Sequence, residues 1–334
     1  MPSGTILRRG ALTSNAIAGT KTLGGVGDTG RRAPGTAGRL RTAFADSPLA
    51  LASLILLLLV LIAALAAPWV GRYSPTATDL RAFEQPPSWA HWLGTDGAGR
   101  DVWSRLVWGS RNSLFVGVVA VGISTAIGAL VGALSGFYGG ALDGILMRIT
   151  DGFLAFPPIV LVLMLASLLG PSIINVVLVI GLLSWTGVAR LVRGQFLSLR
   201  EQDWVVAARS VGVGNGRLIR RHLLPHVVSP IVIAATFGAA VATLTEAGLS
   251  YLGLGVRPPT PSWGAMLAGA QSVHVLQDVP WSWLAPGLTL TTVVLAINYV
   301  GDTLRRALDP HGQTYSARRA RRAARRAIGK KAST

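Results

Sequence analysis

The chain has no cysteine among its 334 residues, and it carries little charge for its length. Without cysteine, the protein can have no disulfide framework, no thiolate metal site and no cysteine nucleophile. Charged residues make up 13% of the sequence, about half of the roughly 25% usual in a soluble domain. Hydrophobic residues make up 51%. This scarcity of charge predicts a protein whose surroundings are largely lipid.

The sequence also lacks the motifs of common enzymes. It has no phosphate-binding loop of the form G-x-x-x-x-G-K-S/T and no plausible Ser/His/Asp site. His222 and His226 have the spacing of two metal ligands on a helix, but no third ligand is near them in the sequence. Capping or lipid-surface roles are expected for both. We therefore expect no catalytic residue, no metal site and no cofactor bound by this chain.

Long apolar runs are the main feature that the sequence does have. A helix needs roughly 20 apolar residues to cross the hydrocarbon core of about 30 Å. The first run is too long, and begins too far along the chain, for a cleaved signal peptide. Pro157 and Pro158 are expected to kink the third run. The predicted fold class is an all-α polytopic membrane protein with six transmembrane helices, at residues 48–68, 113–135, 153–170, 173–190, 227–250 and 284–304.

Basic residues are distributed unevenly between the two sides of these spans. The two tails, the short connection with Arg148 and the connection 190–226 would share one side, and they hold 25 of the 31 lysines and arginines. The positive-inside rule therefore predicts that both termini and the 190–226 connection are cytoplasmic. Aromatic rings that anchor at lipid headgroups agree with this orientation, because the opposite side holds Trp89, Trp92, Trp103, Trp108, Trp263, Trp281 and Trp283.

Composition divides the chain into four parts. Residues 1–46 form a basic N-tail that is expected to be disordered, because it has too few bulky apolar residues for a core. Residues 47–111 hold the first transmembrane helix and an extracytoplasmic segment, and residues 112–308 hold a core of five transmembrane helices. Residues 309–334 form a basic C-tail. Its run RRARRAARR is interpreted as a topology signal and a contact for anionic lipid rather than for nucleic acid.

Two features inside the spans predict helix contacts. Ser124, Gly128, Gly132 and Gly136 recur every four residues, so they share one helix face on which backbones can approach closely. This face would pack either inside the chain or against a second membrane subunit. Glu246 lies in the fifth span, where a carboxylate is costly and should face protein or a water-filled path. It would line a translocation route, carry protons, or have a structural role near the outer interface.

The connection from residue 201 to residue 225 is basic and rich in glycine. Trp204, Ala207, Ala208 and Val211 have helical spacing and would form the apolar face of a short helix. Gly212 is a natural stop for that helix. The small apolar face suits a close fit into a groove on another protein.

The second half of this connection would complete an elbow. Gly214 and Gly216 would permit a sharp turn around Asn215. A second short helix would then run through Arg217, and Pro225 would end it before the fifth span.

The elbow resembles a known family of proteins. Permease subunits of binding-protein-dependent ABC importers carry Glu-Ala-Ala, three residues, Gly, nine residues and Ile-x-Leu-Pro. Val206 stands where that pattern has Glu, and His222 stands where it has Ile. Residues 91–114 and 249–267 resemble segments of the peptide and nickel importer branch, closest to its C-type dipeptide/oligopeptide permease subunit (the DppC/OppC group). The pattern is matched by Ala207, Ala208, Gly212, Leu224 and Pro225.

The resemblance covers most of residues 45–312, and it implies the type I ABC importer permease fold. It implies that the elbow, about 201–225, is a coupling helix that docks on a cytoplasmic ATPase subunit. It also implies a second, B-type permease that completes the pore, two ATPase subunits that bind ATP and Mg²⁺, and an extracytoplasmic solute-binding protein. The coupling residues would be Ala207, Ala208, Gly212, Gly214, Gly216, Arg217, Leu224 and Pro225.

The outward segments 72–111 and 256–283 would either dock the solute-binding protein or form a scaffold that lies on the membrane. An exposed ion pair between Asp101 and Arg105, four residues apart, is expected there. The candidate docking residues are Trp92, Asp96, Arg100, Asp101 and Trp263.

The expected function is therefore that of a permease subunit of an ATP-driven importer of di- or oligopeptides in the bacterial plasma membrane. The same machinery importing nickel or another small solute is one alternative. A proton-coupled secondary transporter that uses Glu246 is an alternative of another class, and it predicts transport without ATP. A membrane scaffold with no transport role is a further alternative.

Overall fold

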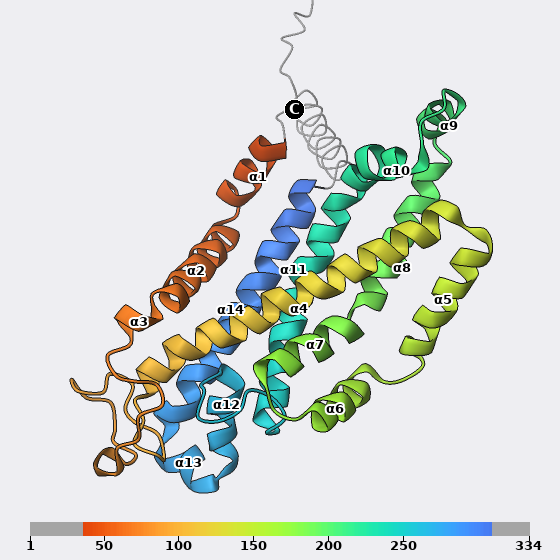
Figure 1. Ribbon diagram of the computed structural model, residues 1–334. Coiled ribbons are helices and arrows are strands. Elements are labelled where there is room, and N and C mark those ends of the chain that lie inside the picture. Colours follow the sequence, from red (N-terminus) through yellow and green to blue (C-terminus); the bar gives the residue numbers. More distant parts are fainter. Residues whose placement is uncertain (1–35, 309–334) are drawn as a thin grey trace, which may run out of the picture. The chain divides into compact units, whose positions relative to one another are not determined.

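The computed structural model describes residues 36–308, and within that range the regular elements are all helical (Figure 1). The N-terminal part holds α1 (Thr36–Ala45), α2 (Pro48–Leu65), α3 (Ala67–Val70) and a short 3₁₀ turn, η1 (Leu80–Ala82). The middle holds α4 (Val102–Tyr138), α5 (Gly140–Leu154), α6 (Pro158–Leu169), α7 (Ile173–Leu183) and α8 (Trp185–Arg200). The elements that follow are α9 (Asp203–Ser210), α10 (Asn215–Arg217), the π-helical turn η2 (Leu218–Leu223), α11 (Leu224–Tyr251), α12 (Trp263–Ala268), η3 (Gly269–Gln271), α13 (Val273–Asp278) and α14 (Pro280–Leu308).

The six predicted spans correspond to five long apolar helical segments and one bent pair. The five segments are Pro48–Leu65, Val102–Tyr138, Ile173–Arg200, Asn215–Tyr251 and Pro280–Leu308. The bent pair is α5 and α6, whose axes meet at 80°. Pro157 takes an extended ψ of 123° because the ring of Pro158 disfavours the helical region for the preceding residue. The kink expected at Pro157 and Pro158 is thereby confirmed.

Two predicted boundaries are wrong. The last part of the N-tail is not without structure, because Thr36–Ala45 forms α1, which packs against α2 and α14. The second transmembrane helix begins at Val102 rather than near residue 113, because Asp101 caps it by accepting a hydrogen bond from Ser104 N–H at 2.7 Å. The predicted basic C-tail and the first 35 residues of the N-tail lie outside the described residues.

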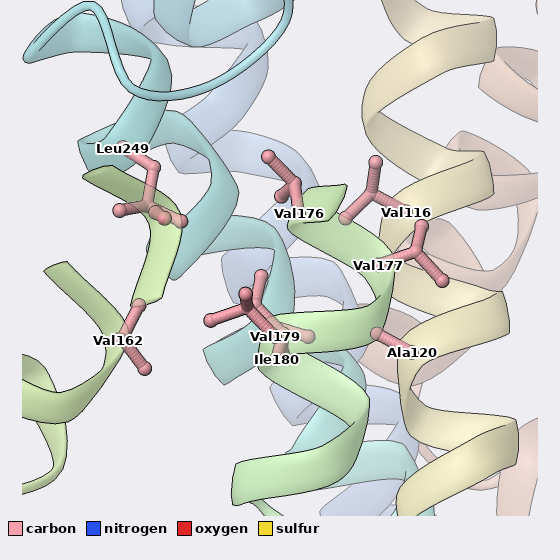
Figure 2. Packing of buried hydrophobic residues seen from close by; sticks show 10 residues of the cluster. Val116, Ala120, Val162, Val176, Val177, Val179, Ile180 and Leu249 are labelled. Carbon is pink, nitrogen blue, oxygen red and sulfur yellow. The ribbon is translucent and has the colours of Figure 1, made fainter. Parts of the chain in front are cut away.

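Helix α4 is the element against which most of the others pack. Its first half contacts α7 and α11 through an apolar cluster that includes Val116, Val176, Ile180 and Leu249, and α6 joins this cluster against α7 (Figure 2). A second cluster joins α4 to α11, α12 and α14 around the fully buried Trp263. A third cluster joins α4 to α8, α9 and the start of α11. These three clusters hold the segments that carry the candidate site.

The stripe of small residues on α4 packs inside the chain, against α8. A Cβ placed on Gly128 would lie 2.6 Å from Val188 Cβ, and one placed on Gly136 would lie 2.6 Å from Phe196 Cβ. Gly132 faces the carbonyl oxygen of Ala189 equally closely. Because α8 covers this face, these glycines bring two helices of the same chain together and do not serve a second subunit.

Candidate functional site

The predicted elbow forms, and it lies at the end of the helices opposite to α12 and α13 (Figure 1). Helix α9 follows α8 after Glu201 and Gln202. Val205 is 0% exposed and anchors α9 in the cluster formed with α4, α8 and α11, and Ala208 packs beside it. Sequence periodicity missed the anchoring role of Val205, because a helix of eight residues offers too few turns to tell its buried face from its exposed one.

The apolar face expected for α9 remains largely uncovered by the described residues. Trp204 is partly exposed, Ala207 is exposed, and Val211 is 80% exposed. The helix is thus held by one face and presents small and apolar side chains on another.

Helix α9 ends just before Gly212, which stops it as the sequence predicts. Gly212 has φ of 82°, in the left-handed region that favours glycine. Its N–H donates to Arg209 O at 2.9 Å, and the N–H of Val213 donates to Ala208 O at 3.1 Å. These two bonds form a Schellman motif, which satisfies the last carbonyl groups of the helix.

The second half of the elbow differs from its prediction in two ways. The turn lies at Gly212–Gly214, because Asn215 and Gly216 are already helical. Pro225 does not end a helix, since the chain is continuously helical from Asn215 to Tyr251. A proline within a helix removes one hydrogen bond and its ring crowds the carbonyl group four residues earlier. The π-turn just before it, in which Leu224 N–H donates to Ile219 O, widens the helix at that place.

One of the two histidines of the elbow stacks on an aromatic ring. The ring of Trp204 lies 5.4 Å from that of His226 at 26°, whereas the ring of His222 lies 6.5 Å away and is tilted by 44°. His226 Nδ1 donates to His222 O at 2.7 Å, one turn earlier in the same continuous helix. Among residues 36–308, no cluster of three or more potential ligands could hold a metal ion.

The remaining predicted coupling residues lie close to this stack in the sequence, just before α10, on α10 and at the start of α11. Arg217 and Pro225 are exposed, and Leu224 is half-buried. The structure therefore brings the predicted coupling residues onto one elbow, whose exposed side has an apolar helix face followed by a basic helix.

Glu246 is fully buried where α11 packs against α4, five residues before α11 ends at Tyr251. Its Oε2 accepts a hydrogen bond from Ser113 Oγ at 2.8 Å, and its Oε1 accepts one from Ser250 Oγ at 2.7 Å. The Ser113 hydroxyl in turn accepts from Trp263 N–H, and that of Ser250 accepts from Val256 N–H. Both carboxylate oxygens are thus used to tie the segment after α11 to α4, which supports the structural interpretation of Glu246.

Several of the outward candidate residues build the segment before α4 rather than a surface. Asp96 accepts from the backbone N–H groups of Ala98 and Arg100 and from Arg100 Nε at 2.9 Å. Asp101 is 4% exposed, and besides capping α4 it accepts a hydrogen bond from His91 Nδ1 at 2.9 Å. The exposed Asp101–Arg105 pair expected from the sequence is wrong.

Arg105 is itself buried and joins three outward segments. Its Nε lies 3.4 Å from Asp96 Oδ2, and its Nη1 donates to Pro75 O at 3.1 Å and to Pro259 O at 3.5 Å. The sequence places Pro259 far from Arg105, so nothing local signals this contact.

Among the candidate docking residues, Trp263 is 0% exposed, which together with the burial of Asp101 removes both from the expected docking surface. Trp92 remains exposed, with the Arg72 guanidinium 4.9 Å from its ring centroid, and the Arg100 side chain is partly exposed beside Asp96.

Comparisons with known proteins give the geometry its context. Residues 128–312 match the family described as binding-protein-dependent transport system inner membrane component. Residues 38–87 match the N-terminal TM domain of oligopeptide transport permease C.

Individual relatives agree with these matches. A protein of Brucella suis biovar 1 whose name contains the words peptide permease protein is 47% identical over 279 residues, which are 84% of this chain and 92% of that protein. The dipeptide transport system permease protein DppC of Alkalihalophilus pseudofirmus is 40% identical over 262 residues, which are 78% and 86% of the two chains. A solved inward-facing structure of the MetNI methionine ABC transporter aligns at a TM-score of 0.47 and 21% identity, over 61% of this chain and 96% of that one.

Proposed function

The chain belongs to the family of binding-protein-dependent transport system inner membrane components, and from this premise we propose that it is a permease subunit of an ATP-driven peptide importer. Peptide is proposed as the substrate class because relatives that are 47% and 40% identical over most of their length carry peptide or dipeptide in their names. Import of nickel or another small solute by the same machinery is the alternative within this class.

One observation carries the coupling role. Helix α9 is anchored by Val205, leaves Trp204 and Ala207 exposed, and leads through a single turn into the continuous helix from Asn215 to Tyr251. A protein that bound the exposed face of α9 would therefore be joined mechanically to a membrane-spanning helix. The proposed partner at this face is a cytoplasmic ATPase subunit, one of two, which would bind the ATP and Mg²⁺.

The proposed orientation and the remaining partners follow from the same arrangement. The basic elbow and both tails would lie in the cytoplasm, in accordance with the positive-inside rule. A second, B-type permease would complete the pore, and an extracytoplasmic solute-binding protein would deliver substrate to the outward end. Since ATP hydrolysis would take place on the ATPase subunits, the chain would be a pore-forming subunit without catalytic residues of its own.

The surroundings of Glu246 bear on the alternative function, that of a proton-coupled secondary transporter. Both oxygens of its carboxylate are hydrogen-bonded to serine hydroxyls inside the chain, and the residue is fully buried. A group that exchanges protons with water needs access to water, so this setting favours a structural role over a proton relay.

The test is an affinity purification of the full chain from detergent-solubilised native membranes, with the co-purifying chains identified by mass spectrometry. We expect a second permease, an ATPase and, after crosslinking, a solute-binding protein. Recovery of the chain alone, under conditions in which another importer complex stays intact, would contradict the proposal.

A pair of variants tests whether α9 is the contact for the ATPase subunits. Ala207→Arg places a charge on the exposed apolar face of α9 and should remove the ATPase subunits while keeping the second permease. Gln202→Arg adds the same charge at an exposed position just before α9, and it should keep both partners. Equal loss of the ATPase from both variants would show that α9 is not the specific contact.

A further inference from the structure

A cavity of about 170 Å³ lies between α4, the junction of α7 and α8, and α11. Most of its α11 wall is made of small residues, among them Ala234, Ala235 and Gly238, whose lack of side-chain volume leaves the space open. On the other sides, α4 contributes Ser124 and Thr125, and Ser184 comes from the break where α7 ends and α8 begins. The cavity is thus lined by helices of one chain, is open on one side, where Ser184 and Val241 are exposed, and has three hydroxyl groups in its lining.

These hydroxyl groups are not fully used within the described part of the chain. Thr125 Oγ1 is buried and has no hydrogen-bond partner among residues 36–308. The side chain of Ser184 does not cap α8, although it stands at the N-cap position. Ser124 Oγ donates to Val121 O at 3.1 Å and keeps its capacity to accept. Because buried polar atoms are nearly always hydrogen-bonded, the orphaned Thr125 hydroxyl calls for a partner inside this cavity.

The cavity lies near the middle of α4, one of the helices long and apolar enough to cross a membrane. On α4, Ser113 bonds to Glu246 at the outward end, and Ser135 bonds to Asp143 at the other end. The 22-residue separation of Ser113 and Ser135 corresponds to roughly 33 Å of helix, close to the thickness of about 30 Å of the hydrocarbon core. Ser124 and Thr125 lie midway between those two serines. An unpaired hydroxyl is least favourable at this depth, since lipid offers it no partner.

On either side of the cavity, α4 is closely packed. About two turns before Ser124, α4 meets α7 in an apolar cluster in which Val116 and Val176 are 0% and 1% exposed (Figure 2). Towards the other end, Gly128 and Gly132 bring α4 against α8 with no room for a Cβ. The space between α4, α8 and α11 therefore lies beside the hydroxyl groups, between two closely packed stretches of α4.

We propose that this cavity is a midplane binding site for a neutral group that both donates and accepts hydrogen bonds, supplied by water or by a peptide bond of the transported substrate. Its volume accommodates on the order of five waters, or one peptide group with a small side chain. Three hydroxyl groups without an ionisable residue in the lining suit a neutral ligand rather than an ion. The peptide bond as a source of this ligand rests on the function proposed above, whereas water as its source does not.

The absence of cysteine from the sequence provides a direct test. Single variants Thr125→Cys and Ser184→Cys are expressed as full-length chains in native membranes and treated with a small, charged methanethiosulfonate reagent. Such a reagent modifies the thiolate form, which requires water at the sulfur atom. Val116→Cys, on the same helix but in the apolar cluster, is the matched control. After purification, the modified fraction of this chain is read by mass spectrometry.

We expect both cavity variants to react at least about tenfold faster than Val116→Cys, in keeping with a hydrated thiol. If saturating peptide then slows the reaction, the ligand includes the peptide group of the substrate. If peptide changes nothing, water is the ligand, and the binding site stands without a substrate role. Reaction of both cavity variants as slowly as Val116→Cys, while a thiol introduced at the exposed Trp89 reacts, would overturn the proposal.

A second pair of variants tests the hydroxyl group itself. Thr125→Val keeps the shape of the side chain and removes the hydroxyl, whereas Thr125→Ser keeps the hydroxyl. If the peptide group is bound, uptake by Thr125→Val should fall about fivefold at limiting peptide, the size of one neutral hydrogen bond, and Thr125→Ser should stay near wild type. Absence of any peptide uptake by the wild-type complex would contradict the proposed function and leave the labelling result unaffected.

Discussion

At the scale of single residues, Gly212 is the position in the elbow where the backbone conformation restricts the side chain. Its φ of 82° lies in a region that costs other L-residues roughly 1–2 kcal/mol, although a Cβ at this position would meet no atom within 4 Å. The constraint is therefore one of conformation and not of space. The sequence pattern identified this glycine because a helix stop is a local property of the chain.

The first prediction is that Gly212→Ala destabilises the elbow conformation by about 1–2 kcal/mol and lowers uptake per complex. Membrane insertion and protein level should stay normal, because the change is confined to the end of α9. Uptake is measured with labelled peptide and divided by the amount of complex. Gly194→Ala is the control, since Gly194 lies within α8, outside the elbow, and a Cβ placed there would meet no atom within 4 Å. Equal losses in both variants would contradict the conformational explanation.

His274 forms an exposed clasp on the outward side. Its Nε2 donates to Glu84 Oε2 at 2.8 Å and its Nδ1 donates to Asp278 Oδ2 at 2.9 Å. Two donating ring nitrogens require the protonated imidazolium. The hydrogen bond to Glu84, and then that to Asp278, raises the pKa of His274 above its ordinary value of 6.5. The clasp connects α13 to the segment that precedes α4.

The second prediction follows from the sign of that pKa shift. A group whose pKa is raised in the folded state stabilises the fold fully below its unfolded pKa, and the effect is lost as pH rises through the folded pKa. Hydrogen exchange near Glu84 and α13, corrected for intrinsic rates, should therefore be slow below about pH 6.5 and become faster above it. His274→Gln should show fast exchange throughout. A wild-type profile that is flat across this range would contradict the clasp.

At the scale of elements, the contact between α4 and α8 depends on the absence of side chains. Gly128, Gly132 and Gly136 face backbone atoms of α8, which cannot move aside as the end of a side chain can. Close approach of this kind supplies van der Waals contact where lipid provides no hydrophobic driving force between helices. Helices α4 and α8 therefore form one unit, and the elbow packs against that unit through Val205.

The third prediction is that Gly132→Leu lowers the free energy of unfolding by about 1–3 kcal/mol through overpacking. A Cβ on Gly132 would lie 2.8 Å from Val192 Cβ, whereas one on Gly122, on the same helix, would meet nothing within 4 Å. Gly122→Leu is accordingly the matched control. The measurement is the thermal unfolding midpoint of each purified variant in detergent. A midpoint that falls equally for both variants would show that the α4–α8 contact is not the cause.

The second half of the elbow is continuous with the helix of the fifth span. The π-turn η2 lets Pro225 stay inside a helix, so α10, η2 and α11 form one rod from Asn215 to Tyr251. A helix that ended at Pro225 would instead have separated the elbow from the fifth span by a joint. A displacement of α9 would therefore be passed to a helix that also borders the cavity.

At the scale of the whole molecule, the outward end is held together by buried polar contacts between segments that are distant in the sequence. Glu246 on α11 reaches Ser113 on α4, and Arg105 on α4 reaches Pro259 after α11. These contacts fix the segment between α11 and α12 against α4. Removal of one partner would leave the other buried without a hydrogen bond, which costs about 1–3 kcal/mol.

The fourth prediction is that Glu246→Leu destabilises the protein by about 1–3 kcal/mol and reduces the amount of assembled complex, because Ser113 and Ser250 lose their acceptor. Glu246→Gln should be milder, since an amide can both accept and donate at the same place. Assembly is measured by size-exclusion chromatography, and uptake is measured with and without a proton gradient. Loss of gradient-dependent uptake in an intact Glu246→Gln complex would instead support a proton-coupled transporter.

The features that the sequence determined by itself depend on residues close together along the chain. The lengths of the apolar runs predict the membrane-spanning helices, paired prolines predict the bend between α5 and α6, and Gly212 predicts the end of α9. Each of these depends on neighbours along the chain, through helix length, ring sterics or backbone freedom. The same local character allowed the family to be identified from the spacing of the elbow residues.

Only the tertiary structure decided which side chains are covered and by what. It placed α8 over the glycine stripe, buried Asp101 and Trp263, and left the Thr125 hydroxyl facing a cavity. Ser113 and Glu246 are 133 residues apart, so no local pattern reveals that they are hydrogen-bonded. Helical periodicity gives the direction of each face, but whether that face meets lipid, another helix or a cavity depends on how distant segments pack together.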